Sequence, residues 1–240
     1  MSRSLCATTS PEVRAAALVL VPVGSVEQHG PHLPLDTDAV IAGAVAHRVA
    51  DRLDRADVLV APPVVYGASG EHQMFAGTAS IGIDALSMLL IELTRSLRTW
   101  ASDVVFVNAH GGNTTALTRA VSLLVAEGHR VGWVPCVAEG ADAHAGLTET
   151  SLMLHLRPEH VWLDRAEAGN TTPVGDLLPA LVAGGVGAVS PNGVLGDPVG
   201  ASPTLGAHLL DLMTDDVAAL VRDGRPDERG MLRMATAPVT

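Results

Sequence analysis

Short apolar runs alternate with amphipathic segments along most of the chain. Nearly continuous apolar runs, typical of strands buried on both faces, occupy residues 17–23, 57–67, 103–112 and 129–137. Apolar residues recur at helical spacing over 38–55, 80–101, 113–128, 145–156 and 204–224. This alternation predicts an α/β fold in which helices pack on both faces of a mostly parallel sheet.

Two potential N-capping residues suggest where two of these helices begin. Asp84 is placed to cap the helix within 80–101, and Asn113 to begin the helix that ends at Gly128. No internal repeat or low-complexity linker divides the 240 residues. We expect a flexible N-terminus over 1–14, a single α/β domain over 15–225 and a C-terminal tail over 226–240.

Composition excludes several classes of function. The net charge of −11 argues against nucleic acid as a partner, because phosphate binding needs a basic face. The chain contains no lysine, which removes Schiff-base and Walker-type chemistry. Cys6 and Cys136 show no CxxC spacing, so a reducing compartment is expected. No apolar run reaches the ~18–20 residues of a membrane span. We therefore expect a cytoplasmic enzyme without a membrane partner.

The stretch "GSVEQHGPHLPLDTD" (24–38) follows the first predicted strand and is rich in potential metal ligands. In an extended segment Glu27 and His29 point the same way and can reach one centre. Asp38 opens the next helix, where a carboxylate suits the positive end of the dipole and could bridge two cations. Alternatively, Glu27 and His29 form an exposed polar pair and Asp38 is only a helix cap.

Two further segments place histidines after predicted strands. His110 follows the run "DVVFV" and precedes "GGN"; it could also be a turn residue before a capping Asn113. His144 and Glu149 lie five residues apart across a loop–helix boundary. Glu149 could equally be a favourable first-turn acid beside capping threonines.

Together these positions suggest a metal centre. Loops that follow parallel strands share one edge of the sheet, where ligand sites usually lie. Mixed nitrogen and oxygen ligands suit two divalent cations of the Zn, Fe(II) or Mn type, and the set comprises Glu27, His29, Asp38, His110 and Glu149. A water held by such cations has a pKa near ~7, giving a bridging hydroxide, and His144 could move the proton to a leaving nitrogen.

The stretches "VPVGSVEQHGPHLPLDTD", "FAGTAS", "NAHGGN" and "HAGLTETS" resemble the creatininase (creatinine amidohydrolase) family over about residues 17 to 220. The resemblance implies a three-layer α/β/α fold with a binuclear centre. Glu27 and His110 would then hold one metal, His29 and Glu149 the other, and Asp38 would bridge them. His144 matches the acid/base histidine, which makes it, with Glu149, the catalytic candidate.

Two positions depart from creatininase itself. Gly112 stands where creatininase has a metal-site glutamate, so Glu149 is the expected replacement. Gly140 stands where creatininase has a tryptophan that gates its pocket. Both differences disfavour creatinine as the substrate and favour a larger, more open site.

Within the family, "YGASGEHQMFAGTASIG" and "GVLGDP" are most similar to the peptidases of the mycofactocin system. This implies a homo-oligomer acting on a ribosomal precursor peptide whose C-terminal Val–Tyr unit has been modified by a radical enzyme. Hydrolysis of the preceding amide would release that unit. Residues that could contact the peptide end are Glu71, His72 and Phe75, although His72 could also be a surface loop residue. The alternatives are hydrolysis of a small cyclic amide or formamide, and a non-catalytic binding module.

Overall fold

A four-stranded parallel sheet forms the centre of the computed structural model, which describes residues 3–234. Its strands are β1 (Leu18–Val23), β2 (Val58–Val60), β3 (Asp103–Asn108) and β4 (Val131–Pro135), in the order β2-β1-β3-β4. Each strand pairs in parallel with its neighbour. The predicted parallel sheet is confirmed.

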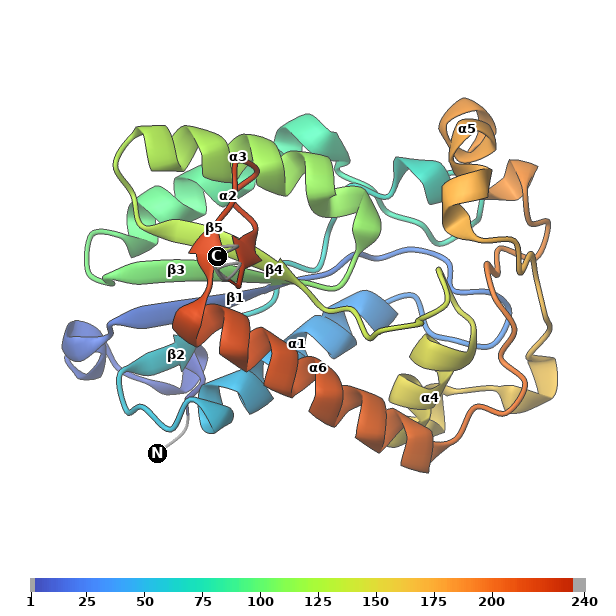
Figure 1. Cartoon of the computed structure of the whole chain (residues 1–240), viewed down its shortest axis with the longest axis horizontal. Helices are drawn as coiled ribbons and strands as arrows, with labels where there is room; N and C mark the ends of the chain where they lie inside the picture. Colours follow the sequence, from blue (N-terminus) through green and yellow to red (C-terminus); the bar gives the residue numbers. More distant parts are fainter. Residues whose placement is uncertain (1–2, 235–240) are drawn as a thin grey trace, which may run out of the picture.

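Helices cover both faces of the sheet in three layers (Figure 1). One face carries α1 (Thr37–Arg52), α4 (Leu147–Leu156) and α6 (Pro203–Asp223); the other carries α2 (Gly82–Leu97) and α3 (Thr114–Ala126). Successive side chains of a strand point to opposite faces, so Leu18 and Leu20 pack under α1 and α6, whereas Val19 and Val21 pack under α2 and α3. Because both faces are covered, the strands read as continuous apolar runs.

The start of α2 differs from the prediction. The helix begins at Gly82, whose φ of 78° makes the turn into it, and Ile81 occupies the N-cap position. Asp84 therefore lies inside the first turn, makes no cap hydrogen bond, and pairs with Arg119 of α3 at 3.0 Å. The capping role assigned to Asp84 is wrong, because the glycine sets the boundary.

The hydrophobic pattern did not predict α5 (Val174–Gly184), which contains Pro179. This helix lies beside the loops that follow the strands, apart from the two helical layers (Figure 1). The short 3-10 helices are η1 (Leu5–Ala7), η2 (Glu12–Ala15), η3 (Gly70–His72), η4 (Gly111–Asn113), η5 (Pro158–His160), η6 (Leu163–Arg165) and η7 (Val186–Ala188).

The predicted tail begins with a small antiparallel hairpin of β5 (Arg225–Pro226) and β6 (Leu232–Arg233). Leu232 is buried in the core that α1 and α6 share, and the Trp133 indole donates a hydrogen bond to the Arg229 carbonyl. Residues 1–2 of the predicted flexible N-terminus and 235–240 of the tail lie outside the described residues. The domain boundaries stay predictions.

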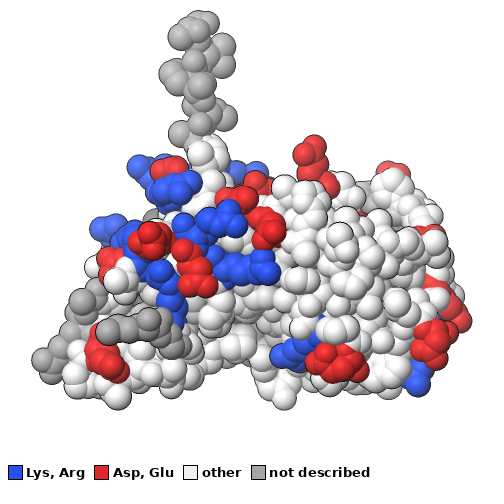
Figure 2. Space-filling model, turned by 90° about the horizontal axis from the view of Figure 1, so that it is seen from below, with Lys and Arg blue, Asp and Glu red and all other residues white. Residues whose placement is uncertain are grey.

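Acidic and basic side chains are mixed on the face seen from below in Figure 2. Between α1 and α6, Arg48 pairs with Asp211 at 2.5 Å, and Arg52 pairs with Asp215. The largest group of charges lies toward one end of this face, and smaller groups lie toward the other end. Acidic and basic side chains are mixed within the largest group, which does not favour phosphate binding there. Among residues 3–234, no helix combines the length and the apolar character needed to cross a membrane.

Candidate metal centre

Three strand-end loops are fastened together by Asn113. The register of the sheet sets Val23 of β1 beside Asn108 of β3, so the loops after both strands start side by side. The Asn113 side chain donates to the Gly24 carbonyl at 2.9 Å and accepts from the Ala68 amide at 2.8 Å. This buried amide joins the segments that carry Glu27, His72 and His110, which is why they converge.

Asp38 lies between two imidazoles. It stands in the first turn of α1 and is 1% exposed. One carboxylate oxygen, Oδ1, is 3.1 Å from His29 Nε2, and the other, Oδ2, is 3.4 Å from His110 Nδ1. The Ser25 hydroxyl donates to Oδ2 at 2.5 Å. The two oxygens therefore face different histidines, as a bridging carboxylate requires.

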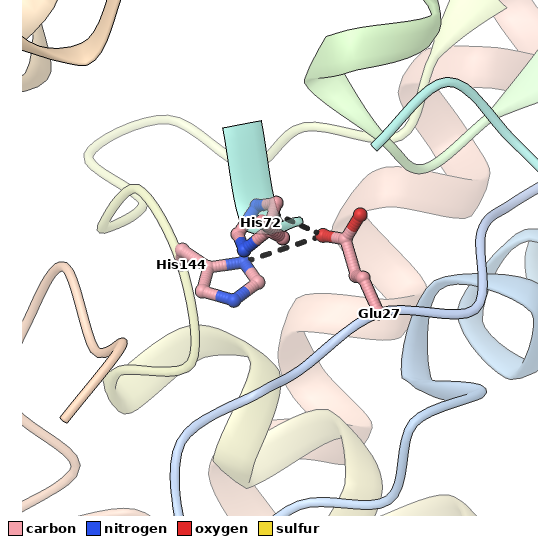
Figure 3. A group of neighbouring side chains, drawn as sticks. All are labelled: Glu27, His72 and His144. Carbon is pink, nitrogen blue, oxygen red and sulfur yellow. Dashed lines mark ion pairs between the residues drawn. The ribbon is translucent and has the colours of Figure 1, made fainter. Parts of the chain in front are cut away.

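Glu27 is a fully buried carboxylate surrounded by histidines. Its Oε1 atom is 3.2 Å from His72 Nε2 and 3.8 Å from His144 Nδ1, and both rings turn toward it in Figure 3. Its Oε2 atom is 3.2 Å from His110 Nε2. Neither oxygen accepts a hydrogen bond of normal geometry. Buried carboxylates without donors are costly, so these atoms fit a cation.

Glu149 enters from the first turn of α4. Its Oε2 atom lies 3.8 Å from His29 Nε2 and accepts a hydrogen bond from the Ala145 amide at 2.6 Å. That amide is presented by a turn in which Ala145 has a φ of 54°, a conformation uncommon outside glycine. The loop before α4 thus brings Glu149 to the same centre.

The side chains form three overlapping groups, each with its ligand atoms within 4.8 Å of one another. These groups are Glu27, Asp38 and His110; His29, His144 and Glu149; and Glu27, His72 and His144. Every predicted metal ligand belongs to one of them. Imidazole nitrogen and carboxylate oxygen are ligands that Zn, Fe(II) and Mn share, so the residues present fit the predicted class of metal.

The charges of these groups depend strongly on one another. Burial alone would lower the pKa of His29, but the adjacent Asp38 carboxylate raises it to about 10. Burial would also lower the pKa of His110, but the Glu27 carboxylate, together with those of Glu71 and Asp38, raises it well above its usual value. Burial raises the pKa of Glu149 to about 7, with the charge of Asp38 adding to the effect. Without a cation, the centre therefore keeps protons on His29 and His110.

His144 has the opposite electrostatic environment. Burial, followed by the charges of His29 and His72, holds the pKa of its imidazole well below the usual value. Its Nε2 atom lies 2.8 Å from the Gln28 carbonyl, to which Nε2–H can donate. The remaining nitrogen, Nδ1, is then an acceptor directed toward Glu27. Such a neutral imidazole can take up and return a proton.

The predicted substrate contacts have different surroundings. Glu71 Oε1 is 3.4 Å from His110 Nε2, and His72 is 4% exposed beside Glu27, so His72 is not a surface residue. Phe75 is partly buried and packs against the small core that includes Leu177 and Val186. Of these residues, only Glu71 and His72 line the cavity at the metal centre.

Two features of the centre were not predicted from the sequence. Gln28 was passed over between two ligand candidates, yet its Nε2 atom is 2.8 Å from His72 Nδ1 and 3.1 Å from His144 Nε2. The second feature is that Gly112 leaves the space that Glu71 fills, because a Cβ at this position would lie 2.3 Å from Glu71 Oε1. The burial of Gln28 could have been suspected from its place within the ligand motif.

Comparisons with known proteins identify the family and the fold of the chain. The family profile described as creatinine amidohydrolase matches residues 7–221. A mycofactocin precursor peptide peptidase from Mycobacterium tuberculosis is 52% identical over 233 residues, covering 94% of this chain and 93% of that protein. A solved mutant creatininase of the Zn-Zn type has a TM-score of 0.75 at 26% identity, covering 92% of this chain and 98% of its own. A solved structure named "Creatininase Mn" has a TM-score of 0.76 at 26% identity, with the same coverage. The predicted three-layer fold is confirmed.

Proposed function

The chain belongs to the creatinine amidohydrolase (creatininase) family, and from this premise we propose that it is a peptidase of mycofactocin biosynthesis that uses two divalent metal ions. The chain is a hydrolase of carbon–nitrogen bonds, as its relatives are. Its proposed substrate is a ribosomal precursor peptide with a modified C-terminal Val–Tyr unit. Hydrolysis of the amide before that unit would release it.

The observation that carries the proposal is the position of Asp38 between His29 and His110, at 3.1 Å and 3.4 Å. A carboxylate with one oxygen toward each imidazole can serve two cations together. Glu27 and His110 would complete the ligands on one side, and His29 and Glu149 those on the other. Zn, Fe(II) and Mn all suit this set, and availability decides among them.

Cations bound there would polarise the amide carbonyl and lower the pKa of a bridging water to near ~7. The protein's own part is to hold the amide and to move a proton. His144, neutral at rest, can receive a proton through Nδ1 and deliver it to the departing amine. Gln28 fixes that imidazole through its carbonyl, and Glu149 is held ready by the Ala145 amide.

The surroundings of the centre suit a substrate larger than creatinine. A cavity of about 690 Å³ adjoins His110 and His144, within the range of sites that enclose small molecules and peptide ends. Gly140 does not border this cavity, and an added Cβ there would meet nothing within 4 Å. We propose that Glu71 and His72 contact the peptide end, whereas Phe75 packs outside the cavity against Leu177 and Val186. We also expect a cytoplasmic homo-oligomer.

Cleavage of the modified precursor by purified enzyme tests the proposal. We expect a chelator to abolish release of the Val–Tyr unit, seen by mass spectrometry, and added Zn(II) or Fe(II) to restore it. Cleavage that persists after complete metal removal would contradict the proposal. Turnover of creatinine or a formamide, with the precursor left intact, would instead support the smaller-substrate alternative.

A further inference from the structure

One cavity contains both the candidate metal ligands and a wall of apolar side chains. Its volume is about 690 Å³. His110 and His144 border it on one side together with Glu71 and His72. The wall, which we call the α5 wall, consists of Val174, Leu178, Leu181 and Val182, and Leu195 also borders the cavity. A molecule bound here would touch both surfaces at once.

The α5 wall is a continuous helical stripe. Its members stand four, three and one residues apart along α5, which places them on one face. Leu178 is 53% exposed and Val182 is 86% exposed. An isolated exposed valine is ordinary, but a contiguous apolar face beside a polar centre usually has a binding role. The helix is anchored by Leu177, which packs with Val186 and Leu195 beside the partly buried Leu181 of the wall.

The position of α5 is tied to the loop that carries Glu71. Gly185 ends the helix with a φ of 69°, and a Cβ there would lie 2.6 Å from the Glu71 carbonyl. The backbone after α5 therefore rests directly on η3, where a side chain would separate them. This contact fixes the distance between the α5 wall and the histidines.

We propose that the α5 wall is a substrate subsite that binds a bulky apolar or aromatic side chain of the unit released by hydrolysis. The inference rests on the proposed peptidase activity and adds the part of the site that selects the substrate. The occupant is a peptide end rather than a second copy of the chain, because the wall borders the same cavity as His144 and Glu71. An apolar wall favours a branched or aromatic side chain over a small or charged one.

Binding of two dipeptides to the metal-loaded enzyme tests the subsite without requiring turnover. Isothermal calorimetry would compare Val-Tyr with Ala-Ala for the wild type, Leu178→Asn and Val182→Thr. We expect the wild type to bind Val-Tyr roughly tenfold or more tightly than Ala-Ala. Leu178→Asn should bring the two affinities close together, and Val182→Thr should reduce the preference in the same direction.

Leu123→Asn on α3 is the matched control, because Leu123 is 44% exposed and does not border the cavity. It should keep the preference for Val-Tyr. Equal affinities in the wild type, no detectable binding of Val-Tyr, or a full preference in Leu178→Asn would overturn the subsite. An altered oligomeric state of Leu178→Asn with an unchanged preference would also overturn it, making the wall a subunit contact. If Leu178→Asn loses the preference for Val-Tyr while the wild type fails to cleave the precursor, the subsite is supported. Only the peptidase assignment is then contradicted.

Discussion

At the scale of single residues, the centre depends on buried carboxylates that lie against imidazoles. Glu27 is fully buried without a donor, and Asp38 is shared by two imidazoles. Such an arrangement is unfavourable for folding unless a cation or protons compensate it. We therefore interpret these residues as functional, since a purely structural role would have favoured an apolar core.

Asp38→Asn should remove the bridge while keeping the size of the side chain. An amide nitrogen cannot bind a cation, so we expect bound metal to fall from about two ions per chain to one or fewer. Cleavage should fall by ~100-fold or more, since removing a residue that only hydrogen-bonds to a metal ligand can already cost up to that much. Elemental analysis and mass spectrometry measure the two effects.

Asp36→Asn is the control, because Asp36 lies two residues earlier, has a side chain that is 44% exposed, and pairs with Arg157 at 3.0 Å. It should leave metal content and cleavage unchanged. An Asp38→Asn variant that kept both ions would argue against the bridging role.

Gly112→Ala should disturb the centre through one methyl group. The added Cβ would lie 2.3 Å from Glu71 Oε1 and 2.4 Å from His110 Nε2. We expect overpacking to cost about 1–3 kcal/mol of folding stability and to weaken metal binding, because His110 must shift. Urea denaturation and a competitive zinc titration measure both.

Gly111→Ala provides the comparison at the neighbouring position, where an added Cβ meets nothing within 4 Å. It should bind zinc as the wild type does. Equal zinc affinity in the two variants would show that the space at Gly112 is not needed by Glu71 and His110.

At the scale of elements, strong hydrophobic periodicity predicted helices correctly, whereas single capping residues were less reliable guides to where a helix begins. The long helix expected over 204–224 is found as α6, because its apolar stripe packs on α1 and α4. Asp84 has a capping residue type, but Gly82 turns the chain two residues earlier. The helix α5 was missed because Pro179 and flanking glycines suggest a loop, whereas contacts of Leu177 with distant residues stabilise it. Tertiary contacts of this kind have no local signal.

Apolar packing should hold α6 more firmly than its surface ion pairs do. Leu210 is fully buried, so Leu210→Ala should cost roughly 2–5 kcal/mol of unfolding free energy. Arg52 and its partner Asp215 have side chains 47% and 55% exposed, so Arg52→Gln should cost less than about 1 kcal/mol. Urea denaturation gives both values. A larger loss of unfolding free energy for Arg52→Gln than for Leu210→Ala would show that ion pairs stabilise α6 more than apolar packing does.

At the scale of the whole molecule, the fold gathers dispersed ligands at one edge of the sheet. Parallel strands, read from the apolar runs, predicted that Glu27, His29 and His110 would meet, and the structure brings them together. The sequence did not indicate that His72 would also reach Glu27, because η3 is placed by packing against α5 and the loop after β1. Nor could it indicate which imidazole nitrogen faces which carboxylate, since this depends on side-chain rotation in the folded state.

Metal loading should release protons from the folded enzyme. With its pKa raised to about 10, His29 is protonated at pH 7.5 in the metal-free protein, and a cation binds only the deprotonated nitrogen. Glu149, with a pKa of about 7, is also partly protonated near neutrality. We therefore expect apparent metal affinity to weaken as the pH falls, with about one or more protons released per chain. Calorimetric zinc titrations in two buffers of different ionisation enthalpy measure the release, and identical heats in both would contradict it.

Anomalous diffraction from crystals grown with zinc tests the central claim most directly, because it locates the ions independently of activity. Two zinc peaks per chain are predicted, one beside Glu27 and His110 and one beside His29 and Glu149, with Asp38 between them. A single peak, or peaks away from Asp38, would contradict the shared two-metal centre.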